Sequence, residues 1–285
     1  MKDNSYEVRI VRYEHIHGVR PEDMAALVAA VNPQPGQSIL EGCAGYGAVT
    51  KELMVKSPES IFTAIDLSEA QIARLRENLP TVPSTYIIQA YMRATGLPAE
   101  SYDTIVIKMG VHEVPLEDQA KLFREVRRLL KPGGFFIIWE LALNQENQAI
   151  FQDIIRKKDH MAGFDSMAEN RYFQREDEVL ELYKQTGFQE IEVTHRIEYT
   201  FNADNRREEL VSCDEREMAH SHGIDAQSEP ALRALLDATA EIRLSNLKAY
   251  IKRRVPIDMY SELKFREEDG NLFITVQKAI YSGRK

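Results

Sequence analysis

Short apolar runs alternate with amphipathic stretches between Gln37 and about Phe201. Five of these runs have the length of strands, and they lie at Ser38–Glu41, Ile61–Asp66, Thr85–Ala90, Thr104–Met109 and Gly134–Leu141. Runs this apolar are typical of strands that are covered on both faces. The alternation therefore predicts a parallel sheet whose strands are connected by crossover helices.

Helix signals lie between and around these runs. Ser68 precedes an apolar-periodic stretch with Gln71 three residues later, which is the spacing of a capping box. Residues 122–130 repeat apolar side chains at helical spacing, and the Lys-Pro-Gly-Gly sequence at 131–134 is expected to end that helix. Further helices are predicted over Pro21–Val31 and Glu178–Thr186.

The pattern changes after Gly187. Apolar and polar residues alternate from Ile191 to Phe201, as in an antiparallel edge strand with one wet face, and a second alternating run follows Asp269-Gly270. The intervening stretch is helical in pattern, with one apolar stripe at Leu232, Leu235, Leu236, Ile242, Leu247 and Ile251. We expect an N-terminal appendage at 1–36, a sheet domain at 37–200, a helical insertion at 201–262 and a final strand at 263–285.

Charge and cysteine content narrow the classes of function. The formal net charge is −9, and nucleic-acid binding requires a basic face, so no nucleic acid is expected as a partner. No apolar run approaches the roughly 18 residues of a membrane span, so no membrane partner is expected either. Two cysteines make a disulfide framework improbable and a cytoplasmic location the simplest expectation. The oligomeric state is left open.

The segment from Ile39 to Thr50 carries the clearest chemical signal. A strand ends in the acid Glu41, a turn of small residues with Gly45 and Gly47 follows, and a helix begins. Such a turn lets the backbone approach a ligand closely, and the first helix amides favour polar or anionic groups. The second strand ends in Asp66, where nucleotide-binding α/β folds place an acid on ribose hydroxyls.

The third glycine position separates two cofactor classes. Dinucleotide-binding turns follow the pattern G-x-G-x-x-G, but counting from Gly45 places Thr50 at the last position. A ligand without a pyrophosphate does not require that glycine. Glu41 favours the same choice, because an acid at the strand end opposes a phosphate and could hold a cationic amino group. A nicotinamide cofactor is therefore disfavoured.

These motifs resemble those of the class I S-adenosylmethionine-dependent methyltransferases. The family's first motif is acid-x-Gly-x-Gly-x-Gly, and here Cys43 replaces its first glycine. Asp66-Leu67-Ser68 is similar to the second acidic motif. Tyr102-Asp103, His112 and the sequence from Leu129 to Gly134 also match. The resemblance covers Gln37–Leu141 well and implies a Rossmann-like, mostly parallel seven-stranded sheet with an antiparallel last strand.

The resemblance also implies a cofactor, S-adenosylmethionine, and assigns residues to it. Glu41 would support its methionine end, Asp66 its ribose, and Leu67 would pack on its adenine. The family places an aspartate on the adenine amino group where this chain has Gln89, whose carbonyl can accept instead. The full set of implied cofactor residues is Glu41, Gly42, Cys43, Gly45, Gly47, Asp66, Leu67, Gln89, Ala90 and Met109. By the same resemblance, the insertion at 201–262 would cover the acceptor as a lid.

Methyl transfer from a sulfonium needs little chemistry from the protein. The enzyme aligns nucleophile, methyl carbon and sulfur and excludes water, and a general base is needed only for an acceptor such as a hydroxyl. His112 follows the fourth strand and is the candidate base, with a structural histidine as the alternative. The pairs His15/His17 and His220/His222 have no companion ligands, so no metal is expected.

The predicted function is in-line methyl transfer to a small organic acceptor. Two alternatives stay open, because both would keep the same cofactor residues. One is methylation of a protein; the acidic balance disfavours RNA but not protein. The other is S-adenosylmethionine binding with different chemistry, such as a cyclisation.

Overall fold

A computed structural model describes residues 19–215 and 229–285, which divide into two compact units. The sheet unit contains Val19–Asn144, Tyr172–Ile197 and Gln277–Lys285. The helical unit contains Gln145–Arg171 and the described part of Glu198–Val276. The predicted domain limits at residues 37, 201 and 263 stay predictions. In the described structure, residues 19–36 group with the sheet unit and residues 145–171 with the helical unit. The lid role of residues 201–262 stays a prediction.

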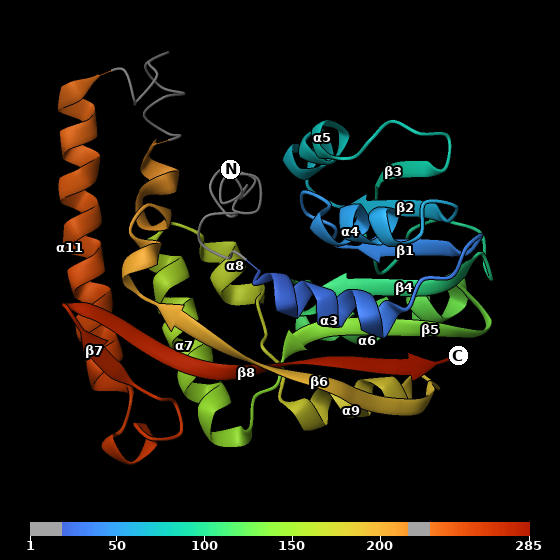
Figure 1. The fold of residues 1–285 in the computed structure, drawn as a ribbon. Helices are drawn as coiled ribbons and strands as arrows, with labels where there is room; N and C mark the ends of the chain where they lie inside the picture. The colour runs from blue at the N-terminus through green and yellow to red at the C-terminus, as the bar shows by residue number, and fades with distance from the viewer. Residues whose placement is uncertain (1–18, 216–228) are drawn as a thin grey trace. The chain divides into compact units, whose positions relative to one another are not determined.

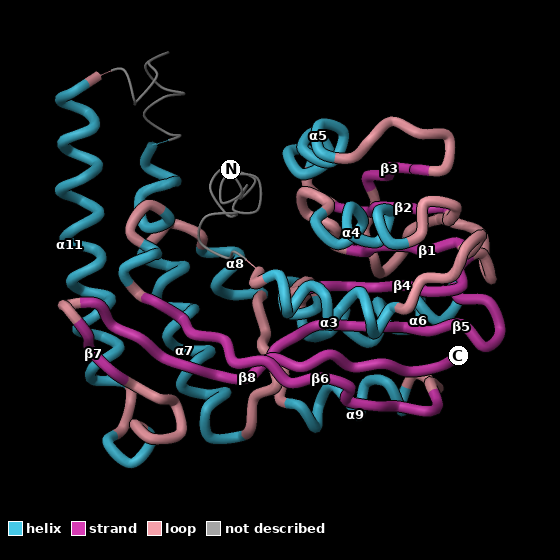
Figure 2. Tube along the Cα trace, in the orientation of Figure 1, coloured by secondary structure: helices cyan, strands magenta, loops and turns pink. Residues whose placement is uncertain are grey.

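Eight strands form one sheet in the order β3-β2-β1-β4-β5-β8-β6, with β7 paired to β8 (Figures 1 and 2). Their bounds are β1 Ser38–Gly42, β2 Ile61–Asp66, β3 Thr85–Gln89, β4 Tyr102–Lys108, β5 Leu130–Leu141, β6 Gln189–Asn202, β7 Arg266–Glu268 and β8 Asn271–Arg284. Neighbouring strands from β3 to β5 pair in parallel, whereas β8 is antiparallel to β5. The predicted Rossmann-like fold class is confirmed.

The sheet has one strand more than predicted. The short strand β7 pairs with β8 across a two-residue turn, Asp269-Gly270, because Glu268 lies opposite Asn271. Both turn residues have positive φ, 50° and 80°, which is the backbone of a tight hairpin that matches strand twist. The predicted turn is therefore confirmed, and it joins two strands.

Helices cover both faces of the sheet unit. They are α3 Pro21–Val31, α4 Ala48–Lys56, α5 Glu69–Asn78, α6 Leu116–Leu129 and α9 Glu176–Gln185. On one face, α3 and α4 pack on a cluster that includes Ile39, Val106 and Trp139. On the other, α6 and α9 pack on the alternate residues of the same strands, such as Leu40 and Ile107. Every second side chain of β1 and β4 therefore faces the same helix layer.

The strand order reverses direction between β1 and β4. The chain runs outward from β1 to β3, crosses back and continues through β4 and β5 on the other side. In open parallel sheets, ligands bind outside the carboxyl ends of the strands at such a switch point. The ends of β1 and β4, at Gly42 and Lys108, therefore mark the place to examine for a site.

The helical unit contains α7 Gln145–Met161, α8 Asp165–Asn170 and the long helix α11 Pro230–Arg254, with short 3-10 turns. The buried stripe of α11 is Leu236, Ala240, Leu244, Leu247 and Ile251. The predicted stripe was partly wrong, because Leu235 and Ile242 are 54% and 64% exposed. Within the described ranges, no helix is long and apolar enough to cross a membrane.

Candidate cofactor site

The turn between β1 and α4 has a backbone that few residues adopt. Cys43, Gly45 and Gly47 all have positive φ, at 51°, 56° and 83°. A Cβ on Gly47 would approach Leu75 of α5 to 2.8 Å, so packing as well as conformation excludes a side chain there. The glycines thus allow the backbone conformation of this turn, which leads from the carboxyl end of β1 into α4 at the switch point.

Glu41 lies at the end of β1 and caps the following helix. Its Oε2 accepts hydrogen bonds from the backbone N–H of Thr50, at 2.8 Å, and from the Thr50 hydroxyl, at 2.5 Å. Among the described residues, no hydrogen bond to Oε1 is made, so this oxygen can accept from a ligand. Burial raises the pKa of Glu41 to about 7, against the lowering effect of the Thr50 hydrogen bonds. Thr50, the residue at the third glycine position, therefore fixes the carboxylate.

Asp66, at the end of β2, is tied to the same turn. One carboxylate oxygen accepts the backbone N–H of Gly45 at 2.9 Å, and the other accepts that of Ser68 at 3.0 Å. Ser68 in turn caps α5 by accepting from the backbone N–H of Gln71, but its own N–H donates to Asp66, so the reciprocal half of the predicted capping box does not form. Asp66 thus has a structural role in shaping the turn, whatever else it binds.

The residues predicted to surround adenine lie at the ends of β2 and β3. Leu67 is 55% exposed, which is unusual for a large apolar side chain and leaves its surface open to a flat ligand. Gln89 donates its side-chain amide N–H to the carbonyl of Leu67 at 3.0 Å. Its carbonyl oxygen has no donor among the described residues. The backbone N–H of Ala90 donates to the backbone carbonyl of Asp66, so the ends of β2 and β3 form one connected edge.

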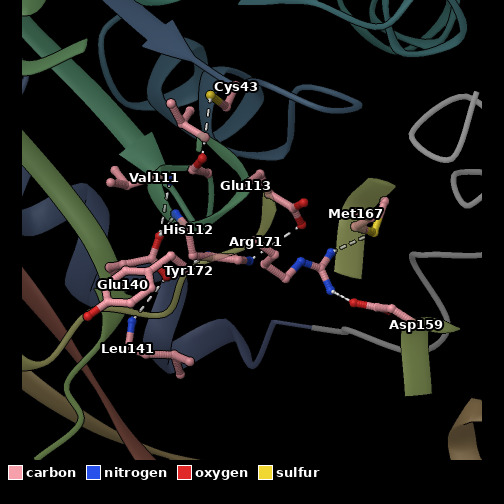
Figure 3. Close-up of polar contacts among 12 residues, drawn as sticks. Cys43, Val111, His112, Glu113, Glu140, Leu141, Asp159, Met167, Arg171 and Tyr172 are labelled. Carbon is pink, nitrogen blue, oxygen red and sulfur yellow. Dashed lines mark hydrogen bonds and ion pairs between the residues drawn. The ribbon is translucent and has the colours of Figure 1, made fainter. Parts of the chain in front are cut away.

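The segment after β4 forms the other wall of the switch point. Met109 has a positive φ of 53° and donates its backbone N–H to the carbonyl of Trp139. The thiol of Cys43 lies 4.0 Å from the carbonyl of Gly110, which joins this wall to the glycine turn (Figure 3). Burial raises the pKa of Cys43 well above its usual value, so the thiol stays protonated and is no nucleophile.

His112 lies in the 3-10 turn Val111–Glu113 and is 3% exposed. Its Nδ1 is 2.8 Å from Oε1 of Glu140 (Figure 3). Its ring stacks on that of Phe173, with 4.6 Å between the ring centroids. Burial lowers the pKa of the imidazole, but the carboxylates of Glu140 and Glu113 outweigh that effect and raise the pKa to about 9. His112 is therefore a charged, doubly partnered side chain at neutral pH.

Two residues beside the predicted site were not anticipated. Glu140 and Lys108 are charged residues at the carboxyl ends of strands whose preceding residues are apolar. This is the signal that singled out Glu41, and applying it to β4 and β5 would have found both. For a metal site, the described residues contain no group of three or more candidate ligands. His15, His17, His220 and His222 lie outside the described residues.

The geometry fits a nucleoside cofactor with an amino-acid tail. Glu41 offers an unused carboxylate oxygen at one end of the glycine turn, and exposed Leu67 lies at the other end beside Asp66. Ribose hydroxyls and an amino group are hydrogen-bond donors, which matches carboxylates at both places. A pyrophosphate would instead face the buried acid Glu41.

Comparison with known proteins agrees with this geometry. Residues 40–138 match a family model described as a methyltransferase domain. Demethylmenaquinone methyltransferase of Chlamydia pneumoniae is 30% identical over 106 residues, which cover 37% of this chain and 45% of that protein. The chain spans less than half the length of the first curated relatives that it matches.

Solved structures share the fold over most of the chain. Phosphoethanolamine N-methyltransferase 2 of Haemonchus contortus, solved with phosphomonomethylethanolamine and S-adenosylhomocysteine, has a TM-score of 0.59 at 18% identity and covers 99% of this chain and 58% of its own. The cyclase SpnF has a TM-score of 0.51 at 16% identity and covers 91% and 79%. Residues 40–138 thus match a methyltransferase domain, and the sheet order and glycine turn are those of the class I Rossmann-like fold.

Proposed function

We propose that the protein transfers the methyl group of S-adenosylmethionine in line to a small organic acceptor. The observation that carries the proposal is the glycine turn held between the carboxylates of Glu41 and Asp66 at the switch point of the sheet. The relative from Chlamydia pneumoniae is a demethylmenaquinone methyltransferase by name, which supports a small acceptor. The acidic net charge of −9 disfavours a nucleic acid as acceptor.

The cofactor supplies an already activated methyl group, so the chain's residues bind and orient. Asp66 would accept from the ribose hydroxyls, Leu67 would cover the adenine face, and Gln89 would accept from its amino group. Glu41 would accept from the ammonium of the methionine end through Oε1. His112, charged at neutral pH, would position the Met109–Glu113 wall beside the acceptor instead of removing a proton.

We expect both S-adenosylmethionine and S-adenosylhomocysteine to bind in titration calorimetry, and Asp66→Ala to weaken both by about 1–3 kcal/mol. Asp103→Ala is a matched control, because Asp103 also accepts a backbone N–H, that of Ser38, but at the opposite end of the sheet. The control is expected to change stability alone. Binding of NAD as tight as that of S-adenosylhomocysteine would overturn the cofactor assignment.

The class of acceptor is tested by separating a cell extract by size. With S-adenosylmethionine, the fraction of small molecules is expected to yield S-adenosylhomocysteine, and the protein fraction is not. Formation only with the protein fraction would favour a protein methyltransferase. The fold of SpnF, a cyclase, also fits this chain, so binding without any S-adenosylhomocysteine formed would favour non-methyl-transfer chemistry.

A pH dependence follows from Glu41. Because its pKa is about 7, the carboxyl is largely protonated at pH 6 and largely ionised at pH 7.5, and only the ionised form pairs well with an ammonium. S-adenosylhomocysteine is therefore expected to bind about five- to tenfold more tightly at pH 7.5 than at pH 6. Methylthioadenosine, which lacks the amino-acid tail, should show no such change, and neither should Glu41→Gln. An equal pH dependence of both ligands would contradict the role of Glu41.

A further inference from the structure

Lys108, the last residue of β4, is a partly buried cation. Its ammonium makes no hydrogen bond or salt bridge to any residue in the described parts of the chain. What lies near it is the ring of Trp139, whose centroid is 5.9 Å from Nζ. The Nε1–H of Trp139 is itself buried and also lacks an acceptor among those residues. Two donors at the ends of adjacent strands are thus left without acceptors.

Lys108 shares a face of the sheet with Glu41. Ile39 and Val106 belong to the apolar cluster on one face, and Glu41 and Lys108 each follow two residues later on the same strands. The strands are adjacent, and Glu41 lies opposite Val106 in the parallel register. Lys108 is therefore one pleat nearer the carboxyl edge than Glu41, on the neighbouring strand.

The two side chains interact electrostatically without neutralising one another. Burial lowers the pKa of Lys108, and the carboxylates of Glu41 and Glu140 act in the opposite direction. The charge of Lys108 likewise acts to lower the pKa of Glu41. No ion pair within 4.0 Å joins them, so a positive and a negative group stand apart on one face of the switch point. Such a pair matches a ligand that carries an ammonium and a carboxylate on one carbon.

We propose that Lys108 binds the carboxylate of the cofactor's methionine moiety while Glu41 binds its ammonium. The proposal rests on the proposed cofactor and adds a specificity residue to it. Lys108 positions the amino-acid tail, and through it the sulfur, against the β4 edge. A carboxylate of an acceptor could be attracted by the same cation, but Glu41 on the same face favours a zwitterion over a simple anion.

The test measures ligand ratios by titration calorimetry. Wild-type protein is titrated with S-adenosylhomocysteine, with its decarboxylated analogue and with methylthioadenosine. The wild type should bind S-adenosylhomocysteine about 10- to 100-fold more tightly than the decarboxylated analogue. In Lys108→Met this preference should fall to within about twofold, with unchanged affinity for methylthioadenosine. Lys108→Arg keeps the charge and should restore part of the preference.

Two controls isolate the cause. Lys278, whose Nζ lies 5.6 Å from the centroid of the same Trp139 ring, is a matched lysine, and Lys278→Met should keep the wild-type preference. Glu41→Gln should weaken both amino-containing ligands and leave their ratio intact. The proposal is overturned if folded Lys108→Met weakens the binding of S-adenosylhomocysteine and of its decarboxylated analogue equally. Failure of all three ligands to bind the wild type would instead refute the proposed cofactor, and this assignment with it.

Discussion

Glu209→Gln is expected to lower the free energy of unfolding by about 3–5 kcal/mol, because it removes one of the two carboxylates that pair with the buried ammonium of Lys158. Glu209 lies in the 3-10 turn Glu209–Val211, and Lys158 lies on α7. The Lys158 ammonium is 2.5 Å from Oε1 of Glu209 and 2.7 Å from Oδ1 of Asp159, with all three side chains at most 4% exposed. Water cannot replace the lost carboxylate at such a site.

The rest of the cluster increases the expected loss. Arg171 pairs with Asp159 at 2.7 Å, and Arg206 lies 3.8 Å from Glu209. Among the described residues, the Glu209 carboxylate lies beside both Lys158 and Arg206, so Glu209→Gln removes a negative charge from beside two cations. The network links α7 to the segment after β6, which are distant in sequence.

An exposed pair of the same unit provides the control. Glu198 pairs with Lys264, and their side chains are 53% and 54% exposed. Glu198→Gln should change the free energy of unfolding by less than about 1 kcal/mol. The double variant Lys158→Met with Glu209→Leu should recover part of the loss, because the ammonium of Lys158 is removed together with the carboxylate that pairs with it. Urea titrations followed by circular dichroism measure all three, and a Glu209→Gln loss as small as that of the control would contradict the role of the network.

The elements that sequence reasoning located have local causes. The helix Pro21–Val31 was predicted with its observed bounds because proline opens it and an Asn32-Pro33 break follows. Strands β1, β2 and β3 were predicted to within one residue, since each is an apolar run bounded by polar or small residues. Glu41 and Asp66 were placed at the carboxyl ends of β1 and β2 for the same reason.

What the sequence did not show depends on contacts between distant segments. Residues 145–171 group with the described part of 198–276 through pairs such as Lys158 with Glu209, and no local pattern marks such a partner. The stripe of α11 was misjudged because Ala240 is buried and Ile242 is not, so burial there follows position around the helix more than side-chain size. Lys108 was missed because a lysine after an apolar strand is usually a solvated charge.

The register of the sheet also produces the His112–Glu140 pair. Lys108 of β4 lies opposite Trp139 of β5, and this is the last pair of the two strands. Glu140 is the next residue of β5, so its side chain meets the turn that follows β4. Oε2 of Glu140 accepts the backbone N–H of Val111 at 3.2 Å, which holds that turn in place. A residue pair set by register cannot be identified from spacing along one chain segment.

His112→Gln is expected to cost about 3 kcal/mol of stability at pH 6 and little at pH 10. The folded pKa of His112, about 9, lies above the unfolded value of 6.5. The native state thus holds the imidazole proton more tightly than the unfolded state does. The resulting contribution to the free energy of unfolding is fully present below pH 6.5 and is lost as the pH rises through about 9. Urea titrations of wild type and variant across that window measure it. Glu140→Gln should remove the same pH dependence, because it removes the carboxylate that keeps the imidazole charged.

The same pKa decides the catalytic role of His112. A general base must be unprotonated to accept a proton, and replacing such a base would lower the rate of the chemical step by roughly 10²–10⁴-fold. An imidazole with a pKa of about 9 is protonated between pH 6 and 8. We therefore expect folded His112→Gln to keep the wild-type pH profile of single-turnover methyl transfer, with a loss of less than about tenfold from misplacement of the Met109–Glu113 wall. His112 would be the base if the single-turnover rate of the wild type rises with pH as one group loses its proton, while the rate of the variant is about 10²-fold lower and does not change with pH. Since Glu140 and Glu113 both hold the charged imidazole, alignment at the switch point is the expected source of catalysis.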